Sequence, residues 1–363
     1  MASIHFFLGA NTAAGFHSLY EPFCDISALD DLLVIKGGAG MGKSTFMKTL
    51  AKAVESVGEP CEYIHCSGDP DSLDAVRFPT LRISAVDGTA PHIIEPELPV
   101  AADRCVDLGR FCNIDGAKQL RGELACRNGD CARAYERVYR CLRARQAVED
   151  ELRSVVQPYA DSEKLRRRMN GILSRELPHR SAKEDGSAAL RFLGGATWRG
   201  WTWRFDTVRS LASRVYALHD RYGFAAPLLA QAASAARTAG FDVIACLSPE
   251  RPDALQHLFI PQLSLAFLTV NDRVPYAQKA YRHIRLDAAI ESAVPRGERA
   301  RLRLLRRLST SIEQEVFAAL REAKGAHDEL EKLYHPLMDF EGIAQLAKEE
   351  SERLCELAAR REK

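Results

Sequence analysis

A glycine-rich segment near the N-terminus has the residue types and spacing of a loop that binds phosphate groups. Such a loop turns backbone N–H groups toward phosphate oxygens, and the N-terminus of the following helix adds a favourable dipole. We expect Lys43 to reach the β- and γ-phosphates and the Ser44 hydroxyl to ligate Mg²⁺. The segment matches the Walker A pattern and predicts a nucleoside triphosphate site. Its residues are Gly37, Gly38, Ala39, Gly40, Met41, Gly42, Lys43, Ser44 and Thr45.

The elements that must position this loop can be recognised on either side of it. The apolar run 32–36 predicts a buried strand, and the pattern over 43–57 predicts a helix. Further strands are expected over 62–65 and 82–86. Because strands and helices alternate, the sequence predicts an α/β core with a parallel sheet and right-handed crossovers. A long helical segment is expected to follow over 116–178.

Asp87 is the best candidate for a second group at the phosphate site. It ends a predicted strand and precedes Gly88. An acid at the carboxyl end of a strand beside the loop strand is where P-loop proteins hold Mg²⁺, often through water. Aspartate also opens turns before glycine. The position favours the Mg²⁺ role and leaves the turn as the alternative.

Two more acids, Asp69 and Asp74, lie in the acidic segment 67–74 after the second predicted strand. Ligands of open α/β sheets bind at this end of the strands, so either carboxylate could orient a water or accept a proton from a substrate hydroxyl. Equally, Ser72 with Asp74 could cap a short helix. The sequence does not separate these interpretations. His92 is a weaker candidate, since a lone histidine near a strand end is more often structural.

The second half of the sequence repeats the first. Residues 7–16 recur as 192–201, and residues 58–81 align without a gap with 240–263. Three landmarks late in each half also match in the same order. Chance could explain one of these three matching stretches, but hardly all three in the same order. The late landmarks are Asp150, Pro158 and Asp161, which match Asp328, Pro336 and Asp339.

We therefore predict two homologous halves, 1–186 and 187–363, that pack on each other. Each is expected to be a P-loop NTPase-like parallel-sheet core followed by a long helical segment. The polar stretch 179–187 is the predicted linker. Elements of the second half are expected at 215–218, 224–239, 242–245, 264–268 and, as helices, 298–361.

The second half lacks the residues that handle a triphosphate. In the gapless alignment its loop is 219–227, where Tyr222 and Phe224 are expected to fill the turn. The cationic side chain of Lys43 and the metal-ligating hydroxyl of Ser44 have no counterparts at the aligned positions, so we expect no phosphate there. Residues lost together with the loop are candidates for nucleotide chemistry. Lys43 faces Ala225, Ser44 faces Ala226, Asp69 faces Arg251, Asp74 faces Gln256 and Asp87 faces Thr269.

Composition excludes several classes of protein. The chain has 363 residues, 46% of them hydrophobic, and a formal net charge of +1. No apolar run approaches the roughly 20 residues that span a bilayer, so no membrane partner is expected. The first residues lack the pattern of a secretory signal, which makes the cytoplasm the expected location. A basic run over 296–307 is interleaved with leucines and indicates the solvated face of a helix, so nucleic acid is not the expected partner.

At these residues the chain resembles a bacterial family of tandem-repeat P-loop proteins described as ATPases or ATP-binding proteins. The resemblance rests on the loop, on 65–74, and above all on the string Asp87-Gly88-Thr89-Ala90-Pro91-His92. It covers essentially the whole chain and implies ATP as a ligand, while Mg²⁺ is expected from the roles of Ser44 and Asp87. Members of that family can carry a phosphate loop in both halves, whereas this chain has one. We therefore expect one nucleotide per chain.

The sequence favours a Mg²⁺-dependent ATPase that uses the N-terminal half, with the C-terminal half as a pseudo-NTPase. Two alternatives remain open. One is a kinase for a small molecule or nucleotide, with Asp69 or Asp74 as base. The other is a nucleotide-gated binding module without turnover. The guanine signature Asn-Lys-x-Asp and the transporter signature Leu-Ser-Gly-Gly-Gln are both absent from the sequence.

Overall fold

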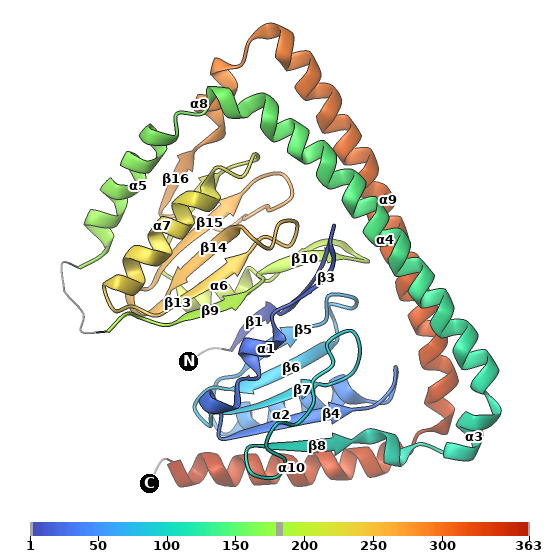
Figure 1. Ribbon diagram of the computed structural model, residues 1–363. Helices are drawn as coiled ribbons and strands as arrows, with labels where there is room; N and C mark the ends of the chain where they lie inside the picture. The colour runs from blue at the N-terminus through green and yellow to red at the C-terminus, as the bar shows by residue number, and fades with distance from the viewer. Residues whose placement is uncertain (1–2, 179–183, 362–363) are drawn as a thin grey trace.

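Two six-stranded sheets lie one above the other beside a pair of long helices, which gives the molecule a triangular outline (Figure 1). The computed structural model describes residues 3–178 and 184–361. Of the predicted linker 179–187, residues 179–183 fall outside the described part of the chain.

The first sheet surrounds the strand that leads into the glycine-rich loop. Its order is β1 (Ile4–Phe7), β5 (Glu62–His65), β6 (Leu73–Phe78), β7 (Ile83–Asp87), β4 (Asp31–Lys36) and β8 (Asp103–Asp107). Strand β6 runs antiparallel to both its neighbours, while the other pairs are parallel. The prediction of a parallel sheet is therefore wrong, and β6 was missed. The connections on either side of β6 are too short for the crossover of about a dozen residues that a parallel pair needs.

The second sheet repeats this arrangement strand for strand. Its order is β9 (Ala188–Arg191), β13 (Val243–Leu247), β14 (Leu255–Ile260), β15 (Leu265–Val270), β12 (Arg214–His219) and β16 (Arg282–Arg285), and β14 is again antiparallel to its neighbours. Helix α2 (Lys43–Ser56) has its counterpart in α7 (Ala225–Thr238). Each sheet also has a small hairpin beside it. These are β2 (Gly9–Thr12) with β3 (Gly15–Ser18), and β10 (Gly194–Thr197) with β11 (Gly200–Trp203). The predicted two-repeat α/β architecture is thus present.

Strand pairing corrects the alignment at one place. Asp31 pairs with Ile83 in the first sheet, whereas Arg214 pairs with Leu265 in the second. Since Ile83 and Leu265 are equivalent, β12 is shifted by one residue relative to β4. His219 therefore ends a strand instead of opening the loop. The connection to the helix is one residue shorter in the second half than in the first.

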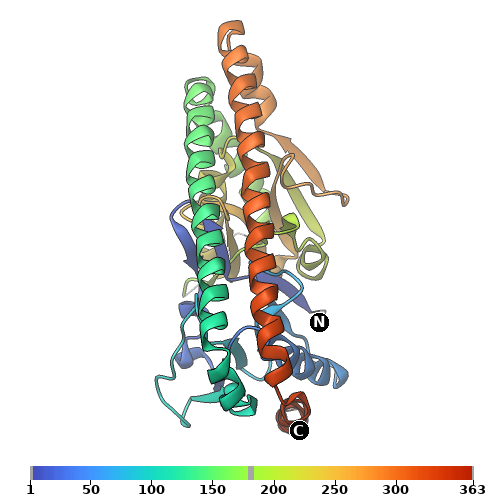
Figure 2. The same cartoon turned by 90° about the vertical axis from the view of Figure 1, so that its right-hand side faces the viewer.

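The two longest helices run side by side in opposite directions across both cores (Figure 2). They are α4 (Arg121–Val156) and α9 (Arg296–Tyr334), and they share a buried contact made by Val138, Val316 and Leu320. Each starts at the core of its own half and ends at the core of the other half (Figure 1). The short helices α3 (Ile114–Gln119) and α8 (Asp287–Ala293) precede them.

Because of this crossing, each sheet is covered by a helix from the opposite half. After α4, helix α5 (Ser162–Glu176) buries Met169 and Leu173 in the core formed by α7 and the second sheet. After α9, helix α10 (Phe340–Arg361) buries Ile343 and Leu354 in the core of α2 and the first sheet (Figure 1). The sequence predicted the helical segments but not the exchange.

Equivalent residues of the two halves also meet directly. Phe7 and Phe192 are both buried and exchange backbone hydrogen bonds, each N–H donating to the other carbonyl at 2.9 Å. Such reciprocal contact is what an approximate twofold axis produces. Beside it, Arg191 Nε donates to Glu62 Oε1 at 2.6 Å, and both side chains are buried. The two halves therefore pack closely through one shared core.

We expect the Glu62–Arg191 ion pair to make folding stability depend on pH. Burial by itself raises the pKa of Glu62, but the Arg191 guanidinium outweighs it and holds the pKa below its usual 4.5. The pair's contribution should be complete at neutral pH and be lost as the pH falls below about 4.5. Glu62→Gln leaves a buried guanidinium without its counter-charge and should cost about 3–5 kcal/mol at pH 7.

Urea denaturation at several pH values measures this effect. Glu21→Gln, which neutralises an exposed acid in the first half, is the matched control. The wild type and Glu21→Gln should lose stability steeply below pH 4.5, and Glu62→Gln less steeply. Identical curves for all three chains would show that the pair adds nothing to stability.

Candidate functional site

The glycine-rich loop connects β4 to α2 and folds tightly around Lys43. Gly40 and Gly42 have φ angles of 70° and 86°, a region that glycine adopts without strain. Lys43 Nζ donates to the carbonyl oxygens of Gly37 and Gly38, each at 2.7 Å. The loop and the first turn of α2 therefore form one unit at the carboxyl end of β4.

Asp87 faces this loop from the end of β7, the strand next to β4. Its two carboxylate oxygens have different surroundings. Oδ1 accepts a hydrogen bond from the Thr89 backbone N–H at 2.9 Å, which is the turn interaction considered as the alternative. Oδ2 lies 3.5 Å from Lys43 Nζ. One side chain thus holds the turn and also presents a charged oxygen to the loop.

A cavity of about 680 Å³ opens in front of the loop. Its volume lies within the range of small-molecule sites. Asp69, Asp74 and Asp87 line it together with Lys48. The structure therefore brings the loop and all three predicted acids to one cavity.

The structure separates the roles of the two acids after the second strand. Asp74 is buried within β6, so the alternative in which Ser72 and Asp74 cap a short helix does not hold. Asp69 instead accepts a hydrogen bond from the Ser72 hydroxyl at 3.1 Å and stabilises the turn before β6. The Tyr20 hydroxyl donates to Asp74 Oδ2 at 2.9 Å. The pKa of Asp74 is raised by burial, with His92 opposing the rise and Asp87 adding to it.

Three side chains, two of which line the cavity, could hold a metal ion. The ligand atoms of Asp74, Asp87 and His92 all lie within 4.8 Å of one another. His92 is buried and stacks on the Tyr20 ring at 4.3 Å, and its ring nitrogens have no hydrogen-bond partner among the described residues. Ser44, the other predicted ligand, accepts a hydrogen bond from the Leu73 N–H at 2.9 Å. Carboxylate and hydroxyl oxygens suit Mg²⁺.

The far wall of the cavity comes from the second half of the chain. Glu331 on α9 packs against Gly40, so that a Cβ at residue 40 would lie 3.0 Å from the Cβ of Glu331. Sequence reasoning missed this wall, because nothing in the repeat shows that the long helices cross. Its residues are His327, Asp328, Glu331, Lys332, His335 and Phe340.

In the corresponding loop of the second half, an aspartate side chain occupies the centre of the turn and accepts hydrogen bonds from the loop backbone. The buried carboxylate of Asp220 accepts hydrogen bonds from the N–H groups of Tyr222 and Gly223 at 3.0 Å and of Ala225 at 2.6 Å. Backbone N–H groups at this position of a phosphate loop face the ligand. Tyr222 and Phe224 are buried beside them, as expected. The side chain of Asp220 therefore takes up the donors that a phosphate would need.

Among the described residues, no helix combines the length and the apolar character needed to cross a bilayer. Comparison of the chain with protein-family models, curated proteins and solved structures finds no match.

Proposed function

We propose that the chain binds Mg·ATP at the loop 37–45 and hydrolyses it, with the second half as a pseudo-NTPase partner. One observation carries the proposal. The cation that follows the glycines and the acid that ends the neighbouring strand converge, with Lys43 Nζ 3.5 Å from Asp87 Oδ2. A lysine in the phosphate loop and an aspartate at the end of a neighbouring strand are both found in the phosphoryl-transfer sites of P-loop NTPases.

Each residue of the site would have a distinct role. Lys43 would exchange its two carbonyl partners for phosphate oxygens, which form stronger charge-assisted hydrogen bonds. Ser44 and Asp87 would hold Mg²⁺, which neutralises charge on the phosphates. Asp74 would orient the attacking water, since its raised pKa makes it a better proton acceptor than an ordinary aspartate. Asp69 stabilises the adjoining turn.

Charge in the cavity supports the need for a metal ion. Acids from both halves line it, including Asp328 and Glu331 on the wall formed by α9. A triphosphate entering such a cavity would be repelled unless cations accompany it. Binding is therefore expected to require Mg²⁺.

Two alternatives share the same site. A kinase would transfer the γ-phosphate to an acceptor in the cavity, with Asp74 or Asp69 as base. A nucleotide-gated module would bind without turnover. The wall of α9 residues against Gly40 favours gating as the alternative, because a ligand at the loop would contact a helix that reaches the other core.

Measurements of phosphate release and of nucleotide stoichiometry test these proposals. We expect one ATP per chain by calorimetry with Mg²⁺, and free phosphate without any acceptor. Transfer to an added nucleoside, nucleotide or sugar would indicate a kinase, and tight binding with neither product would indicate a gate. Two nucleotides per chain would contradict the assignment of the second half.

A further inference from the structure

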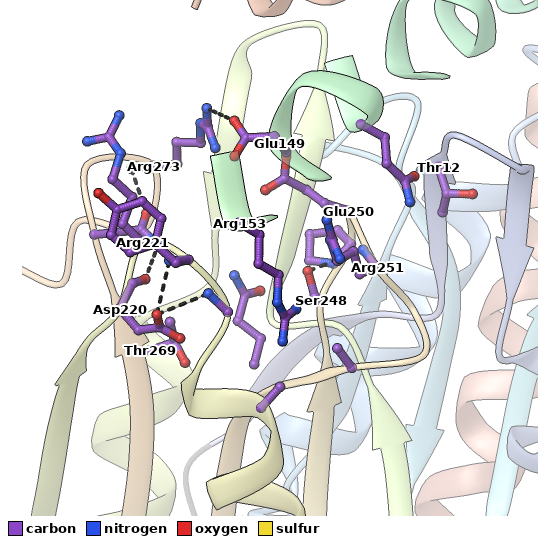
Figure 3. Close-up of a pocket in the computed structure, with 18 of the residues that line it drawn as sticks. Thr12, Glu149, Arg153, Asp220, Arg221, Ser248, Glu250, Arg251, Thr269 and Arg273 are labelled. Atoms are coloured by element: carbon purple, nitrogen blue, oxygen red, sulfur yellow. Dashed lines mark hydrogen bonds and ion pairs between the residues drawn. The ribbon is translucent and has the colours of Figure 1, made fainter. Parts of the chain in front are cut away.

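A second cavity lies in the other half of the molecule, between the loops of the second core and helix α4 (Figure 3). Its volume is about 110 Å³, against about 680 Å³ for the cavity at the glycine-rich loop. Positive charge exceeds negative charge in its lining, because the acids there are only Glu149, Asp220 and Glu250. The basic residues are Arg145, Arg153, Arg221, Arg251 and Arg273.

Arg153 differs from the other arginines of this cavity. It extends from α4 into the space between the loops of the second core (Figure 3). Within the described residues its guanidinium has no acidic partner, and its one ring contact is with Phe224, at 5.7 Å. Each of the others forms an ion pair: Arg145 with Glu250, Arg221 with Asp272, Arg251 with Asp150, and Arg273 with Glu149.

Unpartnered polar atoms are concentrated around the same cavity. Asn11 Nδ2 and Thr269 Oγ1 have no hydrogen-bond partner in the described chain, although these side chains are only 4% and 6% exposed. Gln256 Oε1 and Arg145 Nε are likewise unpartnered. Buried polar groups are rarely left without partners in folded proteins, so several around one cavity point to a bound ligand.

The charge balance favours an anion as that ligand. Burial, together with the nearby Arg273, lowers the pKa of Arg145 to about 10, although Glu149 and Glu313 oppose this. A negative group in the cavity would relieve the repulsion between these guanidinium groups. Asp220 already takes up the N–H groups of the loop, so the anion would be held by side chains instead of by the backbone.

We propose that this cavity binds the phosphate group of a small molecule, with Arg153 as the main contact. The donors are Arg153 and Arg145 Nε on α4 and Asn11 on β2, and three such groups suit a ligand with several acceptor oxygens better than a two-oxygen carboxylate. The cavity is too small for a nucleotide held as in the first half. Since Arg153 belongs to α4, such a ligand would contact both halves of the chain.

Calorimetric titration of the Lys43→Ala chain tests the proposal, because that substitution removes the phosphate-binding lysine of the first half. The probe is inorganic phosphate, with malonate as the carboxylate comparison. We expect one phosphate per chain, affinity that weakens with added salt, and weaker binding of malonate. In the same background Arg153→Gln should weaken phosphate binding at least tenfold. Arg140→Gln, an exposed arginine on the same helix, should leave it unchanged.

Three results would overturn the proposal. The first is no saturable binding at phosphate concentrations of about 10 mM, with circular dichroism showing a folded chain. The second is an equal affinity in the Arg153→Gln chain, and the third is tighter binding of malonate than of phosphate. Repeating the Arg153→Gln comparison in the wild-type background excludes an effect of the Lys43 substitution. None of these results depends on ATP hydrolysis in the first half.

Discussion

Lys43→Ala should abolish tight binding of ATP and all turnover. Lys43 Nζ is the cation closest to the loop carbonyls of Gly37 and Gly38, and its removal deletes both the charge and its hydrogen bonds to phosphate. A loss of about 3 kcal/mol is expected, which corresponds to a roughly 100-fold weaker affinity. Calorimetry with Mg·ATP measures it directly.

The control for this experiment is Lys52→Ala, an exposed lysine on the same helix. It should bind ATP like the wild type. Lys43 also donates hydrogen bonds to the carbonyl oxygens of Gly37 and Gly38, so its loss could disturb the loop itself. Circular dichroism and thermal unfolding should therefore be recorded for both variants. Unchanged ATP affinity in a folded Lys43→Ala chain would show that ATP does not bind at this loop.

At saturating Mg²⁺, Asp87→Asn should still bind ATP, and turnover should fall by about 100- to 1000-fold. The two oxygens of Asp87 make this substitution informative. The amide oxygen of asparagine can still accept the Thr89 N–H, so the turn is kept. The charge that faces Lys43 and would hold Mg²⁺ is lost. The Mg²⁺ concentration needed for half-maximal turnover should rise accordingly.

Asp107→Asn provides the matched control, because Asp107 also ends a strand beside β4 and accepts a backbone N–H, that of Gly109 at 2.8 Å. Its side chain is exposed and lies outside the cavity lining. If Asp87→Asn has wild-type turnover with the usual Mg²⁺ requirement, Asp87 only stabilises its turn and does not hold Mg²⁺.

Much of the fold was predictable because its signals are local. The glycine-rich loop, the helix after it and the buried strands on either side follow from residue types within a few positions. The repeat follows from matching landmarks, and both sheets have the same strand order. Strand β6 was missed because Leu73–Phe78 directly follows an acidic stretch that resembles a loop. The antiparallel pairing depends on the lengths of the connections, which the sequence analysis did not use.

The sequence predicted only those residues of the candidate site that come from the first half of the chain. The loop and the acids Asp69, Asp74 and Asp87 line one cavity. Tyr20, which donates to Asp74, and the α9 residues carry no motif. They reach the site only through tertiary packing, because α4 and α9 each run from the core of their own half to the core of the other half. The one-residue difference between the loops became visible only through strand pairing.

The exchange of covering helices has a consequence for how the chain is made. Chains usually fold in segments from the N-terminus as they leave the ribosome. Here Leu50 and Ile83 share their core with Leu354 and Ala358, which are synthesised much later. This core of the first sheet must therefore remain incomplete until α10 has been synthesised. A nascent chain would expose part of this apolar core until then, and a chain released before α10 would never cover it.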